Sequence, residues 1–216
     1  MITDLSELTP VKALIFRVTH IDNVPWVLAN GLHCMKSKAQ DPNFVSIGNT
    51  DLIQKRTARQ VPVGPGETLA HYVPFYFTPC SPMLYNIRTG WADNVKRSKS
   101  ELVVFVVSLR SLEVYDVPFV FADRHAYLAM AKFSNRLADL DNLAWRYWQS
   151  RDFKRDANDP GKTERYQAEA LIHRYLPAER IEAIACSRKQ ERATVAKMVQ
   201  NHGKQIQVVC RKDWFF

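Results

Sequence analysis

The chain has 216 residues, of which 46% are hydrophobic and 24% charged, a composition that excludes collagen-like, low-complexity and wholly disordered proteins. This length suits one domain with a substantial core. Thirty Lys and Arg against 22 Asp and Glu leave a formal net charge of +8, which favours polyanions, above all nucleic acid, as partners. A generally basic protein without such a partner fits the composition equally well.

The sequence predicts neither a membrane span nor an export signal. The longest apolar runs, such as 102–107, have six residues, whereas about 20 are needed to cross a bilayer. The opening MITDLSE lacks the basic and apolar regions of a signal peptide. Four cysteines stand singly, without the paired spacing of a zinc site or redox motif. We therefore expect a cytoplasmic protein with reduced thiols, no membrane attachment and no metal.

The first half of the chain predicts short elements around one long excursion. Apolar and β-branched residues predict strands at 13–19 and 72–77, and Pro74 within the second predicts an edge position or a bulge. Residues 33–68 form an excursion of the kind that is usually functional in compact domains. One helix is predicted at 23–30, with Asp22 as its N-cap and Gly31 ending it. A basic helix is predicted at 51–59, and a third begins after an N-cap at Ser81, with Pro82 as its first residue.

The second half predicts five strands and two helices. The strands are expected at 102–109, 117–121, 169–173, 181–186 and 206–210. One helix is expected at 138–148, ahead of a charged loop at 151–161, and another runs from a Ser187–Gln190 capping box to Asn201, with Gly203 closing it. Strands and helices mix without a regular alternation, which favours an α+β fold over a doubly wound sheet. We expect one domain, 1–216.

The common nucleotide and hydrolase signatures are absent. The chain contains no GxGxxG, GxxxxGK[ST], HExxH or GxSxG sequence and no kinase set. A Rossmann dehydrogenase, a P-loop enzyme, a zinc protease and an α/β-hydrolase therefore have no support.

Glu169 is the first residue that calls for a chemical explanation. Apolar neighbours on both sides predict a partly buried carboxylate at the head of a strand. A salt bridge to Arg165 or Arg174 is the structural interpretation. The functional interpretation is a carboxylate in a cleft that orients a sugar hydroxyl and stabilises a cationic transition state.

Four further residue sets fit either a structural or a functional role when taken singly. Arg17 lies in an apolar strand that ends at His20, so it either points to water or presents its charge at the strand end. Met83 and the aromatic residues of 72–77 are as consistent with a core as with a ligand platform. His125 fits a surface histidine equally well.

These residues gain meaning from their order along the chain, which resembles the DarT family of bacterial DNA ADP-ribosyltransferase toxins. The resemblance covers nearly the whole chain. It is carried by VTHIDN at 18–23, NGL at 30–32, the Arg56 segment leading into VPVGPG at 61–66, HYVPFYF at 71–77, SPML at 81–84, VPFVF at 117–121 with Asp123 and His125, YQAEAL at 166–171, and the aromatic tail at Trp214. Each piece is a weak pattern, but the ordered set is specific.

The resemblance implies an ADP-ribosyltransferase fold with a central split β-sheet surrounded by helices, NAD as co-substrate and single-stranded DNA as acceptor. It implies that Glu169 and Arg56 are catalytic. Arg17 stands where some relatives have His. The residues implied to surround the NAD are Arg17, Thr19, His20, Asn23, Tyr76 and Met83, and those implied or expected to meet the DNA are His125, Arg59, Lys154 and Arg155.

The stretch 61–84 looks more like the thymidine-modifying branch of the family than the guanosine-modifying one. The expected reaction breaks the bond between nicotinamide and ribose and joins the ribose to N3 of thymine. The resemblance also implies a macrodomain antitoxin that removes the modification. Guanosine, RNA or protein as acceptor, an RNA 2′-phosphotransferase reaction, and a non-catalytic nucleic-acid-binding module remain as alternatives.

Overall fold

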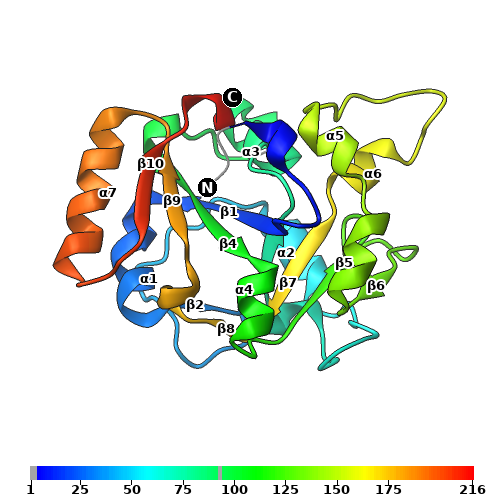
Figure 1. Ribbon diagram of the computed structural model, residues 1–216, viewed down its shortest axis with the longest axis horizontal. Coiled ribbons are helices and arrows are strands. Elements are labelled where there is room, and N and C mark those ends of the chain that lie inside the picture. The colour runs from blue at the N-terminus through cyan, green and yellow to red at the C-terminus, as the bar shows by residue number, and fades with distance from the viewer. Residues whose placement is uncertain (1–3, 92–93) are drawn as a thin grey trace.

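The computed structural model describes residues 4–91 and 94–216, which form an α+β structure around a mixed eight-stranded sheet (Figure 1). The strands lie in the order β10-β9-β4-β1-β3-β7-β5-β6, and only β9 and β10 pair in parallel. Two further strands, β2 and β8, form a small separate sheet. The strands are β1 Leu14–His20, β2 Leu32–His33, β3 Tyr72–Tyr76, β4 Leu102–Ser108, β5 Phe119–Ala122, β6 Phe133–Ser134, β7 Glu169–His173, β8 Tyr175–Leu176, β9 Ala183–Cys186 and β10 Gln207–Cys210.

Seven α-helices of the described residues surround the sheet, with α7 beside β9 and β10, and α5 and α6 at the opposite side (Figure 1). No helix in the described part of the chain is both long enough and apolar enough to cross a membrane. The helices are α1 Val24–Asn30, α2 Thr50–Arg56, α3 Pro82–Thr89, α4 Leu109–Val114, α5 Trp145–Gln149, α6 Lys162–Tyr166 and α7 Lys189–Asn201.

The large sheet is split between β1 and β3. β1 pairs with β4 along all seven residues but with β3 only through Phe16 and Tyr76. Beyond that pair Arg17 Nη1 donates to the carbonyl of Pro74 at 2.8 Å. The guanidinium thus takes the place of the backbone N–H that a fully paired β1 would offer to this carbonyl. The expected split sheet is thus confirmed, and the two halves meet at a single residue pair.

Pro74 helps to produce this split. In an antiparallel strand the N–H and C=O of one residue point to the same side, so the missing N–H of Pro74 faces β1, as its carbonyl does. The predicted edge position was wrong, because β3 is an interior strand paired with β7 along five residues. A proline is tolerated there because the strand lacks a full partner on that side.

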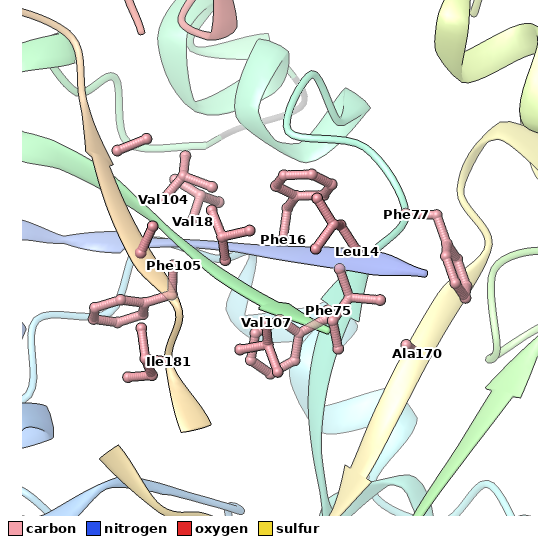
Figure 2. Close-up of a cluster of buried hydrophobic side chains, with 14 of the residues drawn as sticks. Leu14, Phe16, Val18, Phe75, Phe77, Val104, Phe105, Val107, Ala170 and Ile181 are labelled. Atoms are coloured by element: carbon pink, nitrogen blue, oxygen red, sulfur yellow. The ribbon is translucent and has the colours of Figure 1, made fainter. Parts of the chain in front are cut away.

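A large apolar core holds the β1 half of the sheet to the helices. Figure 2 shows Leu14, Phe16 and Val18 on one side of β1, with Phe105 and Val107 of β4 on the other. Phe16 packs edge-on against Trp214, which is completely buried, with ring centroids 5.4 Å apart. The C-terminal segment therefore completes the core next to the split.

A second, smaller core covers the face of the β3 half that carries Glu169. Val61, from the 33–68 excursion, and Leu69, which directly follows it, pack with Ala126 on this face. The strand residues beneath them are Tyr72, Val120, Ala122 and Leu171. Part of the excursion is therefore built into the sheet's surface.

Most predicted elements are present, with ends shifted by a few residues. Ser81 caps α3, accepting from the N–H of Leu84, and Gly31 follows α1 with a φ of +79°, both as expected. The helix expected at 51–59 ends at Arg56 and begins behind an Asn49 cap. All four cysteines are free, as predicted.

Three local predictions were wrong because side chains found other partners. Asp22 is not the cap of α1; its N–H donates to the His20 ring, and a 3₁₀ turn leads into the helix. The helix expected at 138–148 breaks into a 3₁₀ helix and α5, where the Trp145 indole donates to the carbonyl of Leu140. Ser187 donates to the carbonyl of Lys99 rather than capping α7.

Trp214 gives a test of the core. Replacing it with Ala should lower the free energy of unfolding by about 3 to 5 kcal/mol, because a buried ring and its contacts with Phe16 are lost. Trp91, which is 69% exposed, provides the matched control, and its replacement by Ala should change stability by about 0.5 kcal/mol or less. Denaturant titration of both variants measures the difference, and equal losses would contradict the described core.

Candidate functional site

Glu169 lies where the two halves of the sheet meet. It is the first residue of β7 and pairs with Tyr76 on β3, the residue that also makes the only β1–β3 pair. Its side chain is 2% exposed and lies on the face covered by the smaller core. A buried carboxylate needs a cation or several hydrogen-bond donors.

Arg56 supplies the cation. Its guanidinium binds the carboxylate in a two-point arrangement, Nη1 to Oε1 at 2.8 Å and Nη2 to Oε2 at 2.6 Å. The backbone N–H of Ala126 adds a third donor to Oε1 at 3.0 Å. The salt bridges considered from the sequence were wrong, since Arg165 pairs with Asp159 and Arg174 with Glu67.

Burial alone would raise the pKa of Glu169, but the charge and hydrogen bonds of Arg56 outweigh it, so the pKa lies below its ordinary value. Burial would likewise lower the pKa of Arg56, and the carboxylate of Glu169 reverses that shift. Both groups are therefore ionised at neutral pH.

His125 borders the carboxylate. Its Nδ1 accepts the N–H of Tyr127 at 3.2 Å and lies 3.2 Å from Oε1 of Glu169. Burial lowers the pKa of His125 below its ordinary value, so the ring is neutral at pH 7.

Arg17 and Tyr76 complete the group beside the split. Burial lowers the pKa of Arg17 to about 10, which leaves it charged, and its Nε is buried without a partner among the described residues. Burial and the charge of Glu169 raise the pKa of Tyr76, so its hydroxyl keeps its proton. Two cations and one carboxylate leave the site a net positive charge, which suits an anionic substrate.

Thr19, His20 and Asn23 are buried together at the far end of β1. The Asn23 amide donates to Thr19 Oγ1 and to the carbonyl of Val45, both at 3.0 Å, and accepts the N–H of Val45 at 2.8 Å. These bonds tie the excursion to β1. His20 lies 3.6 Å from Glu101 through its Nε2.

The side chains of the remaining predicted residues are engaged elsewhere in the described chain or exposed. Met83 is half-buried on α3 and packs on the main core. Arg59 donates to the carbonyls of Leu128 at 3.1 Å and Ala129 at 3.3 Å, which ties the excursion to the loop after His125. Lys154 and Arg155 are exposed on the loop between α5 and α6.

Three contributors were not foreseen: the N–H of Ala126, the backbone of Val45 and the N–H of Tyr127. All are backbone groups, and the sequence carries no signal for them. Among the described residues no group of three His, Cys, Asp or Glu side chains is arranged to hold a metal ion.

Comparison with known proteins gives a consistent result. A family model described as "ssDNA thymidine ADP-ribosyltransferase, DarT" matches residues 16–216. A protein named DNA ADP-ribosyl transferase from Escherichia coli O127:H6 is 46% identical over 211 residues, covering 98% of this chain and 97% of that protein.

Solved structures of Thermus sp. 2.9 DarT have the same fold. The complex with ADP-ribosylated ssDNA superposes with a TM-score of 0.84 at 31% identity, over 96% of this chain and 98% of that one. The complex with NAD+ gives a TM-score of 0.81 at 30% identity, over 95% of this chain and 98% of that one.

One more distant relative joins two proteins in one chain. It is a DNA ADP-ribosyl transferase–DNA ADP-ribosyl glycohydrolase fusion protein from Thermosipho africanus, 22% identical over 207 residues that cover 94% of this chain and 49% of the fusion.

The Arg56–Glu169 pair predicts a pH-dependent stability. Arg56→Gln removes the cation that keeps the buried carboxylate ionised, so at neutral pH the variant should be less stable by about 3 kcal/mol. A carboxyl whose pKa is lowered by folding adds stability above its unfolded pKa, about 4.3, and loses it as the pH falls through the folded value. Without Arg56, burial raises the pKa of Glu169 in the folded variant, so its carboxyl becomes neutral at a higher pH than in wild type, and the gap should already narrow as the pH falls from neutral toward about 4.

Denaturant unfolding between about pH 3.5 and 8 measures this gap. Arg155→Gln, on an exposed loop, is the control and should match wild type throughout. A gap of constant size down to the lowest pH would show that Arg56 does not act through the ionised carboxylate.

Proposed function

Since the chain belongs to the DarT family of single-stranded DNA thymidine ADP-ribosyltransferases, we propose that it transfers ADP-ribose from NAD to thymidine in single-stranded DNA and releases nicotinamide. The observation that carries this proposal is the buried, ionised carboxylate of Glu169 at the split of the sheet, held by Arg56. The whole chain acts as one catalytic domain. The predicted cytoplasmic location stays a prediction.

Glu169 stabilises the reacting ribose. Departure of nicotinamide leaves positive charge on C1″ and the ring oxygen, as in glycoside cleavage, and a fixed carboxylate lowers the energy of that state. The ribose hydroxyls hydrogen-bond to the same carboxylate. Both of its oxygens already bind Arg56, so the guanidinium must share them or move away when the ribose arrives. α2 contributes no buried side chain, and little packing therefore opposes such a movement.

Arg56 and Glu169 then act on the acceptor base. The new bond joins N3 of thymine to C1″, the bond from C1″ to nicotinamide breaks, and the N3 proton leaves. Arg56, displaced from the carboxylate, stabilises negative charge on the thymine oxygens. Glu169 accepts the proton, because its charge is no longer required once the ribose cation is captured. His125 borders this reaction, because its ring lies beside the carboxylate that acts on the acceptor base.

The residues near the split bind NAD. Arg17 offers a partly buried cation whose Nε has no partner in the described protein, which suits an anionic or carbonyl oxygen of NAD. Tyr76 supplies a ring beside Glu169, and Thr19, His20 and Met83 line the remainder. The amide of Asn23 is fully engaged, so it shapes this site by holding Val45.

The acceptor is a single strand because the target base must leave its stack to enter the site. The exposed Lys154 and Arg155 contact its phosphates, in keeping with the net charge of +8. Arg59 contributes by fixing the excursion against the loop of His125. A DNA ADP-ribosyl glycohydrolase of the macrodomain type is the partner that reverses the modification, since the Thermosipho relative carries a glycohydrolase in the same chain.

One experiment tests the proposal directly. The protein is incubated with NAD and oligonucleotides of varied sequence, and the digested nucleosides are analysed by mass spectrometry. ADP-ribosylated thymidine is the expected product. Modified guanosine, modified RNA or protein, or unreacted NAD would each overturn it in favour of a different activity.

Replacing Glu169 provides a mechanistic prediction. Glu169→Gln should lower the rate of DNA modification at least a hundredfold, because the neutral amide does not stabilise the ribose cation. Glu164→Gln is the matched control: Glu164 is 40% exposed and pairs only loosely with Arg124 at 3.6 Å. Quantitative mass spectrometry with melting curves of both variants separates chemistry from folding, and a folded Glu169→Gln variant of normal rate would exclude the assigned role.

The nature of the acceptor gives a further prediction. Duplex DNA of the same sequence should be modified poorly, since its bases are paired and stacked. Affinity for the single strand should fall as salt rises, with a slope of about 0.7 in the logarithm for each phosphate contacted. Rates on both forms and binding titrations at several salt concentrations check this. Equal rates on duplex and single strand, or salt-independent binding, would argue against DNA.

A further inference from the structure

A second cavity lies at the far end of β3 and β7 from Glu169. We call it the β2–β8 pocket, because residues of the small sheet and its flanking loops line it, among them His33, Lys36, Lys38, His71, Arg174 and Tyr175. Its volume is about 450 Å³, within the range of small-molecule sites. β2 and β8 lie along the lower edge of the molecule in Figure 1.

The pocket is positively charged. Lys36 and Lys38 are exposed on the loop that follows β2, and Arg174 follows β7 with 63% of its side chain exposed. Arg174 forms an ion pair with Glu67 at 2.6 Å, whereas no carboxylate of the described residues lines the cavity itself. Two lysines beside an arginine paired with Glu67 suit an anion such as a phosphodiester.

An exposed aromatic ring stands among these cations. Tyr175 is 40% exposed, and its ring centroid lies 4.6 Å from that of His33. The ring also lies against Gly31, where an added Cβ would lie 2.5 Å from a ring atom. The ring is thus supported by two neighbours and leaves part of its surface open.

The surrounding loop is internally bonded. Both ring nitrogens of His33 are engaged, by Ser37 at 3.0 Å and by the carbonyl of Asn30 at 2.9 Å. The Gln40 amide donates to the carbonyls of Cys34 at 3.0 Å and Ser37 at 2.9 Å. The lysines therefore project from a structured loop beside the aromatic ring.

A supported aromatic ring bordered by cations is the arrangement that proteins use to bind single-stranded nucleic acid, the ring stacking on a base and the cations meeting its phosphates. We propose that the β2–β8 pocket is a second subsite for single-stranded DNA, in which Tyr175 stacks on a nucleotide flanking the target and Lys36 and Lys38 bind its phosphates. The proposal rests on the DNA acceptor proposed above.

The distance between the two sites fits one strand. Glu169 begins β7 and Arg174 directly follows its last residue, so about five residues of strand, roughly 16 Å, separate them. A strand of about four or more nucleotides occupies both sites, whereas a shorter one reaches only the catalytic site. The subsite therefore increases affinity for long oligonucleotides alone.

The test compares oligonucleotides of about three and about twelve nucleotides that carry one thymidine. Tyr175→Ala should raise the KM for the long oligonucleotide roughly tenfold, the loss expected for one stacked base, and should leave the short one and the KM for NAD unchanged. Tyr175→Phe keeps the ring and should behave as wild type. Lys36→Ala with Lys38→Ala should reduce the salt slope by about 1.4, and Lys197→Ala, on an exposed part of α7, should not change it.

The outcomes separate this proposal from the function on which it depends. If wild type modifies no oligonucleotide, the DNA acceptor itself is wrong. If wild type modifies both lengths and Tyr175→Ala keeps the normal KM for the long one, only the subsite is overturned. A rise in the KM for NAD would instead assign the pocket to NAD, and melting curves of each variant identify a loss that comes from unfolding.

Discussion

The interruption of hydrogen bonding between β1 and β3 is the constraint on which the site depends. A continuous ladder would place a backbone donor of β1 against each β3 carbonyl that faces it and leave no room for a side chain. Pro74 has no N–H on that side, and Arg17 inserts its guanidinium instead. The two half-sheets stay joined at Phe16 and Tyr76, so Glu169 is held rigidly beside the opening. The break in the sheet thus creates polar space next to a well-packed core.

The charges of Arg56 and Glu169 within that space are costly to bury. Their arrangement therefore reflects a role in the reaction as well as in stability. An ion pair taken out of water gains little over apolar residues of similar size. Here one partner belongs to a strand with a very regular register, and the other to a helix that has no buried side chain. The anion is fixed and the cation is carried by a displaceable element, which allows the same two groups to serve successive steps of a transfer reaction.

Local patterns in the sequence predicted seven of the ten described strands and the position of Glu169, because side-chain alternation and apolar runs depend on neighbouring residues only. The two-residue strands β2, β6 and β8 are too short to leave such a pattern. Local patterns did not predict the partner of Glu169, which lies 113 residues away. Nor did they predict that the Asn23 amide and the Arg59 guanidinium bond to backbone carbonyls of distant loops. The cap prediction at Ser187 failed for the same reason, since a tertiary hydrogen bond to Lys99 outcompeted the local one, whereas Asp22 is engaged by its near neighbour His20.

The burial of Trp214 against Phe16 has a consequence for synthesis of the protein. β1 leaves the ribosome early, but its packing partner follows almost two hundred residues later. The central strand order, with β1 between β3 and β4, also requires long-range pairings that form slowly. A nascent chain therefore holds an incomplete core and an unfinished catalytic opening until residue 214 is available. An enzyme that modifies DNA would in this way acquire its activity only after translation has passed the C-terminal core residues Trp214 and Phe215.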